Sequence, residues 1–110
     1  MRKRRYVTHI PPADGQPGLE LGWPADCQSA MDDALQRAEH WLAQANKPIL
    51  WTAMIIGRQE QDGATRRTAY EVAFLTRLQQ RLEELERAAR ERQASRDRRS
   101  RLQGVILPPV

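Results

Sequence analysis

The stretch Thr68–Arg101, TAYEVAFLTRLQQRLEELERAARERQASRDRRSR, decides the fold that we expect of this chain. It contains no glycine or proline and consists largely of strong helix formers, so it predicts one long helix over 68–101. Thr68 and Glu71 have the spacing of a capping box, which favours a helix start at Thr68, and Gly104 favours a stop. Such a helix would be roughly 50 Å long, whereas a compact chain of this size has a radius of gyration of about 13 Å. Part of it should therefore project, bend, fray or pack on a second chain.

A short leucine seam runs along the first half of this helix. Apolar residues alternate at steps of three and four, as at the a and d positions of a heptad: Leu75, Leu78, Leu82, Leu85 and Ala89. The same register continues with arginines at 92, 96 and 99, so the seam is shorter than an autonomous coiled coil requires. We expect the start of the helix to dock on its own domain and the four leucines to mediate self-association. A helix packed entirely within its own monomer is the alternative.

Length and composition indicate one domain spanning residues 1–110, because a chain with 40% hydrophobic residues can bury a single core of modest size. Cys27 is the only cysteine, which excludes an intramolecular disulfide and a cysteine-based zinc site and fits a reducing cytosol. Prolines follow the basic N-terminus where a signal peptide would have its apolar segment, and the longest apolar run is too short to span a membrane. We expect a cytoplasmic protein without membrane contact.

Charge is distributed unevenly along the chain. The N-terminal end, residues 1–5, contains four basic residues, and the basic end of the long helix, 87–101, contains seven arginines against Glu91 and Asp97. Residues 6–86 carry a net charge of −5. Basic ends on an acidic body suit an acidic protein surface or a phosphate backbone, although a solvated charged face is the commoner reading of such a pattern.

The remaining chain predicts two strands and a second helix. Residues 4–10 alternate and are rich in β-branched and aromatic types, as in a strand. A loop rich in glycine and proline leads to an amphipathic helix over 27–45, with Asp26 or Ser29 as its cap. Residues 49–56 form a nearly continuous apolar run, which predicts a strand buried on both faces, with Trp51 in the core.

These elements predict an α+β fold in which an amphipathic helix and one long C-terminal helix pack on a small sheet of two to four strands. A strand buried on both faces needs more cover than one helix provides, so we expect dimerisation to complete the core. The apolar tail 105–110 is expected to add an edge strand or to serve as a docking peptide.

The sequence offers no catalytic, cofactor or metal site. The two histidines, His9 and His40, and the single cysteine show no ligand spacing and no pairing typical of a nucleophile and its base. We therefore expect a protein that is not an enzyme and holds no cofactor or metal.

Binding remains as the function. We expect a small regulatory or inhibitory protein that acts by protein–protein binding, in the style of phage or mobile-element accessory proteins that dock on a host protein. Trp and Arg are the residues most enriched at interface hot spots, so the expected partner-binding residues are Trp23, Arg87, Arg90, Arg92, Arg96, Arg98 and Arg99. The alternative is a nucleic-acid-binding regulator that uses the arginine-rich ends, although no helix-turn-helix or RNA-recognition pattern supports it.

Overall fold

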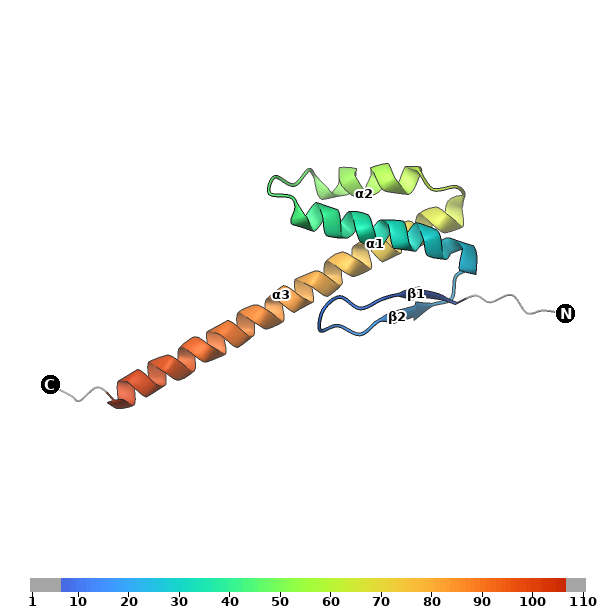
Figure 1. Cartoon of the computed structure of the whole chain (residues 1–110). Coiled ribbons are helices and arrows are strands. Elements are labelled where there is room, and N and C mark those ends of the chain that lie inside the picture. The colour runs from blue at the N-terminus through green and yellow to red at the C-terminus, as the bar shows by residue number, and fades with distance from the viewer. Residues whose placement is uncertain (1–6, 107–110) are drawn as a thin grey trace.

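The computed structural model describes residues 7–106 and contains a small sheet and three helices (Figure 1). The elements in chain order are β1 (Thr8–Ile10), β2 (Leu19–Leu21), a 3-10 turn η1 (Ala25–Cys27), α1 (Gln28–Ala43), α2 (Leu50–Gln59) and α3 (Ala64–Ile106). The expected α+β fold with a small sheet and one long C-terminal helix is confirmed. The N-terminal end 1–5 and residues 107–110 of the tail lie outside the described residues.

The centre of the fold is the contact between α1 and α3. Small residues on both helices are buried there, among them Ala34 and Ala38 on α1 and Ala69 and Ala73 on α3. Because an alanine carries only a methyl group, the two backbones can approach closely, and larger side chains fill the space at either side. These are Ile10, Met31, Leu35, Met54, Tyr70 and Phe74. The rings of Tyr70 and Phe74 stack with their centroids 6.1 Å apart.

The sheet consists of β1 and β2 alone, which pair antiparallel with Thr8 opposite Leu21 and Ile10 opposite Leu19. Gln28 at the start of α1 covers the other edge of β1. Its side-chain amide accepts a hydrogen bond from the His9 N–H and donates one to the His9 carbonyl, both at 2.8 Å. A side chain thus takes the place of a third strand, which satisfies backbone groups that an edge strand leaves unpaired.

The predicted buried strand over 49–56 is wrong, because this segment is helix α2. Its inward side buries Met54 and Gly57, while Ile49, Trp51 and Ile56 are exposed. Trp51 is therefore not a core residue. A short apolar run does not by itself distinguish a strand from a helix, and a strand here would need neighbours that the three-residue strands β1 and β2 do not offer. A helix satisfies its own backbone groups.

Gly57 allows α2 to pack closely on α3. A Cβ at this position would overlap the hydroxyl and the ring carbon Cζ of Tyr70. The Tyr70 hydroxyl is buried and has no hydrogen-bond partner among the described residues. Its burial raises the pKa of Tyr70 to about 12, against the opposing effect of the nearby Arg37. The missing side chain of Gly57 thus makes room for the largest ring of the core.

Helix α3 is longer than predicted at both ends. It begins at Ala64, after Gly63 with φ +86°, so Thr68 lies inside the helix and its hydroxyl donates to the Ala64 carbonyl at 3.0 Å. The predicted capping box is therefore wrong. Gly104 does not end the helix, which continues to Ile106 and includes the first residues of the predicted tail. A single glycine costs a helix only about 1 kcal/mol, which is too little to stop one.

The C-terminal half of α3 projects from the rest of the molecule (Figure 1). The whole molecule therefore spans 80 × 38 × 14 Å and has a radius of gyration of 20.5 Å. Arg87 is the last residue along α3 with a side-chain hydrogen bond to the rest of the fold, from Nη1 to the Gly15 carbonyl at 3.0 Å. We call residues 7–87 the body and the helix from 88 to 106 the arm. At 1.5 Å per residue the arm is about 28 Å long.

A cluster of charged side chains joins α1 and the loop at Pro11 to α3. Glu39 on α1 accepts hydrogen bonds from Arg77 at 3.0 Å and from Arg81 at 2.9 and 3.2 Å. Arg77 also donates to the Pro11 carbonyl at 2.9 Å. Burial alone would raise the pKa of Glu39, but the hydrogen bonds from Arg81 and Arg77 outweigh it, and the pKa lies below its ordinary value. Ionised Glu39 therefore stabilises the fold.

We predict that Gly57→Ala destabilises the protein by about 1 to 3 kcal/mol, because the added methyl group overpacks the contact with Tyr70. Urea unfolding followed by circular dichroism measures the change. Tyr70→Phe removes a hydroxyl without a hydrogen bond and should itself cost little. The double variant should recover part of the loss, and additive effects of the two substitutions would contradict the proposed contact.

We predict that stability falls as the pH drops from about 5 to about 3, in part through Glu39. A group with a lowered folded-state pKa contributes fully above its unfolded-state pKa, about 4.3 for glutamate, and loses the contribution as the pH falls through the folded-state value. Glu39→Gln should be less stable at pH 7 and show a smaller fall over this range. Parallel curves for both proteins would show that Glu39 has no such role.

Candidate protein interface

The outer face of α2, with Ile49 directly before the helix, exposes large apolar side chains. Ile49, Trp51 and Ile56 are 75%, 65% and 56% exposed, and no charged residue occurs between Lys47 and Arg58. By helical spacing Trp51 and Ile56 lie on the two borders of the exposed side of α2. Large apolar side chains exposed on an uncharged surface are typical of a protein-binding surface. The sequence analysis missed this surface because it placed the same residues in a strand buried on both faces.

The body holds this helix in place from its inward side. Met54 and Gly57 are buried, and Ile55 is half-buried against the core. Arg58 at the C-terminal end of α2 donates to Glu71 of α3 at 3.2 Å. The apolar residues of the outer face are thus presented on a helix whose other side is packed, which limits the entropy that binding would cost.

The leucine seam of α3 is divided between the core and the surface. Leu78 is half-buried and packs against the core, so part of the predicted self-association surface is already used within the monomer. Leu75, Leu82 and Leu85 are exposed, at 45%, 50% and 62%. These three leucines form an apolar stripe along α3 where it leaves the body.

A groove lies beside each end of this stripe. The groove at Leu75 has a volume of about 400 Å³ and lies between α3 and the loop that holds Gln16, Pro17 and Leu19. The groove at Leu85 has a volume of about 320 Å³, and its lining includes Leu42 of α1. Hollows next to exposed leucines provide space for side chains of another protein or another copy.

The predicted partner-binding residues do not come together in one site. Trp23 is half-buried against the core, so it is not the exposed aromatic residue that we expected. Arg87 is half-buried beside Gly15, whereas the five others lie exposed on the arm: Arg90, Arg92, Arg96, Arg98 and Arg99. Trp51 on α2 supplies the exposed tryptophan instead.

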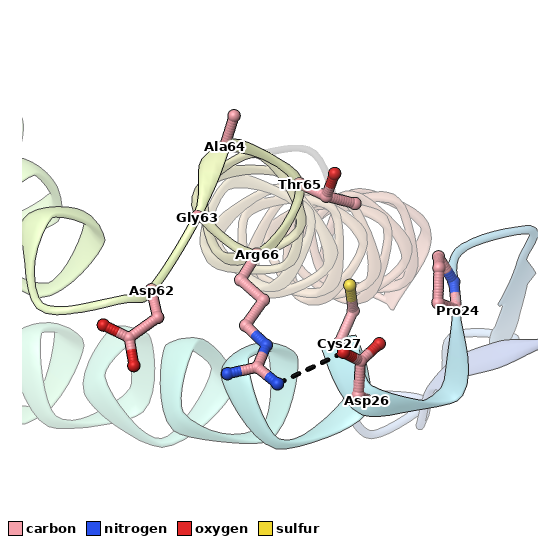
Figure 2. A pocket seen from close by; sticks show the side chains of 8 residues that line it. All are labelled: Pro24, Asp26, Cys27, Asp62, Gly63, Ala64, Thr65 and Arg66. Carbon is pink, nitrogen blue, oxygen red and sulfur yellow. Dashed lines mark hydrogen bonds and ion pairs between the residues drawn. The ribbon is translucent and has the colours of Figure 1, made fainter.

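A hollow of about 500 Å³ lies where the start of α3 meets η1 (Figure 2). Arg66 donates to Asp26 there at 3.1 Å, beside the buried Cys27. Burial, aided by the charge of Asp26 and opposed by Arg66, raises the pKa of the Cys27 thiol, which disfavours the reactive thiolate. The lining includes no histidine that would act as a base. This hollow therefore does not have the residues of a nucleophilic site.

Among the described residues, no group of three or more histidine, cysteine or carboxylate side chains is arranged to hold a metal ion. Within residues 7–106, no helix is both long and apolar enough to cross a membrane.

Comparisons with known proteins identify a family. The family described as "LasR-specific antiactivator QslA" matches residues 12–82, which include α1, α2 and the start of α3 but not the arm. A chain in the crystal structure of the LasR LBD–QslA complex from Pseudomonas aeruginosa is 51% identical and superposes with a TM-score of 0.66, covering 71% of this chain and 83% of that chain. No match was found among curated proteins.

These comparisons bear on the expected function. An antiactivator that forms a complex with another protein is an inhibitor that acts by protein binding and not a class of enzyme. This confirms the expectation of an inhibitory protein that acts by protein–protein binding. Neither comparison refers to a phage, a mobile element or a nucleic acid. By the extent of the family match and the identity to the solved chain, this protein belongs to the QslA family of LasR-specific antiactivators.

Proposed function

We propose that this protein is a small antiactivator that binds the ligand-binding domain of a LasR-type regulator and opposes its action. The proposal is supported by the membership in the QslA family and by the likeness to a chain crystallised with the LasR LBD. A cytoplasmic location is part of this proposal, because an antiactivator has to share a compartment with the activator that it opposes.

We propose the outer face of α2 as the surface that contacts this partner. The observation that carries the proposal is the exposure of three large apolar side chains, Ile49, Trp51 and Ile56, in a stretch without charged residues that lies within the family's matched residues 12–82. Exposure of these side chains to water costs a free energy of about 25 cal/mol for each Å² of apolar surface. A partner with an apolar patch of its own would cover it, with Trp51 as the central anchor.

The exposed stripe of Leu75, Leu82 and Leu85 is proposed as a self-association surface. It lies on the opposite side of α3 from the buried alanines Ala69 and Ala73, so a second copy can reach it without disturbing the core. The grooves at Leu75 and Leu85 support this proposal, since they provide space beside the stripe for side chains of a second copy. Self-association through α3 would leave the outer face of α2 accessible.

We predict that Trp51→Ala weakens binding to a purified LasR ligand-binding domain by about 2 kcal/mol, or roughly 30-fold in Kd, as measured by isothermal titration calorimetry. Its free energy of unfolding should change by less than about 1 kcal/mol, because the ring is mostly exposed. Gln36→Ala, at an exposed polar position on α1 outside the proposed contact, is the control and should bind normally. Equal affinity of Trp51→Ala and the wild type would place the contact elsewhere.

We predict that the wild type sediments as a dimer at tens of micromolar and that the double substitution Leu75→Asp and Leu82→Asp gives a folded monomer. Both leucines are exposed within a single chain, so the new charges would be buried only at an interface between copies. Ala94→Asp, which adds a charge to α3 outside the stripe, should leave the dimer intact. A monomeric wild type at this concentration would refute the proposal.

A further inference from the structure

The arm has an excess of positive charge that nothing in the described part of the chain neutralises. Six exposed arginines lie along it: Arg90, Arg92, Arg96, Arg98, Arg99 and Arg101. None of them forms an ion pair among the described residues, and the two carboxylates of this segment, Glu91 and Asp97, leave a net charge of +4. Like charges on one helix repel one another, so this arrangement does not help the helix to form.

In the body, by contrast, most arginines form ion pairs. Arg37, Arg58, Arg66, Arg77 and Arg81 each pair with a carboxylate of the body. Glu39, for example, binds two of them, and Glu71 binds Arg58. The carboxylates of the body that form no ion pair are spread over β2, α1, the loop before α3 and α3 itself, so a second copy offers the arm no compact cluster of unpaired carboxylates: Glu20, Asp32, Asp62, Glu83 and Glu86. The ligand of the arm should be an anion from outside this protein.

Helical spacing places the arginines of the arm on two sides of the rod. At about 100° per residue, Arg92, Arg96 and Arg99 share one side, while Arg90, Arg98 and Arg101 lie roughly opposite. The major groove of double-stranded DNA admits one α-helix and has phosphates along both walls. A helix with cations on two opposite sides matches such a groove better than it matches a flat acidic surface.

The arginine-bearing stretch of the arm, residues 88–101, lacks the residues of an ordinary protein interface. Its only apolar side chains are the alanines at 88, 89 and 94, and a single large apolar residue, the 60% exposed Leu102, directly follows it. Protein–protein interfaces depend on buried aromatic or large apolar anchors at their centre. Contacts with phosphates need only cations that displace condensed counterions.

We propose that the arm binds double-stranded DNA through its phosphate backbone, without preference for a sequence. This function is independent of the proposed antiactivator function, because the arm lies outside residues 12–82, to which the family match is confined. The arm also extends away from α2 (Figure 1), so that DNA and a partner on α2 can be bound at the same time.

The test is fluorescence anisotropy of the full chain with a labelled 30-base-pair duplex of random sequence, at 50 and 200 mM salt. The wild type should bind more tightly at low salt, with a slope of log K against log salt of about −0.9 for each phosphate contacted. The variant with Arg92, Arg96, Arg98 and Arg99 changed to Gln should lose at least about tenfold in affinity at low salt, and its slope should be shallower by up to about 3.6.

The matched control changes the same four arginines to Lys, which keeps the charge and should retain most of the binding and the slope. Circular dichroism checks that all three proteins are equally helical. A wild type that does not bind the duplex at low salt, or a Gln variant that binds it as well as the wild type does, would overturn the proposal.

Titration with the LasR ligand-binding domain separates this proposal from the proposed function. The Gln variant should bind that domain with unchanged affinity, whereas Trp51→Ala should bind DNA normally. The opposite result would be a wild type that does not bind DNA and a Gln variant that loses affinity for the domain in a salt-dependent manner. In that case the arm contacts an acidic protein surface and the DNA proposal is wrong.

Discussion

The close contact of α1 with α3 is the constraint on which the other parts of the structure depend. Alanines on both helices let the backbones approach, and the buried rings of Tyr70 and Phe74 fill the space beside them. The same pair of helices carries the Glu39 cluster, in which Arg77 also reaches back to the loop at Pro11. Without this contact neither the hairpin nor α2 would have a surface to pack on.

The same constraint explains why apolar residues remain exposed. Three helices and a two-stranded sheet enclose a small core, and a core of this size cannot cover every apolar residue of the chain. Gly57 brings the inward side of α2 close to Tyr70, which turns Ile49, Trp51 and Ile56 outward. The residues exposed in this way belong to the part of the chain that the antiactivator family shares. The exposure of these side chains follows from the packing, and it leaves an apolar surface that another protein can cover.

The arm and the body differ in whether their arginines are paired with carboxylates. In the body, five arginines lie within 3.6 Å of carboxylates, and several of these pairs join one element to another, as Arg58 joins α2 to α3. In the arm, arginines face water from a helix that packs against no other described element beyond Arg87. Charge that is paired within a fold serves stability, whereas unpaired charge on a projecting helix is available to an outside anion.

The sequence by itself determined the local features. The absence of glycine and proline between Thr68 and Arg101 predicted the long helix, and the alternation of residues 4–10 predicted the first strand. The length of the predicted helix implied that part of it projects, bends, frays or packs on a second chain, and the structure shows that it projects. The tertiary structure decided which side of each apolar segment is buried. Residues 49–56 are apolar at every position except Thr52, so no periodicity could show that Gly57 packs on Tyr70 or that Trp51 faces water. Trp23 was expected to be exposed and Leu78 to contact a second copy, and only the tertiary structure showed that both are half-buried against the core of their own chain. Burial depends on neighbours far apart in the sequence, and that information lies in the packing and not in the local pattern.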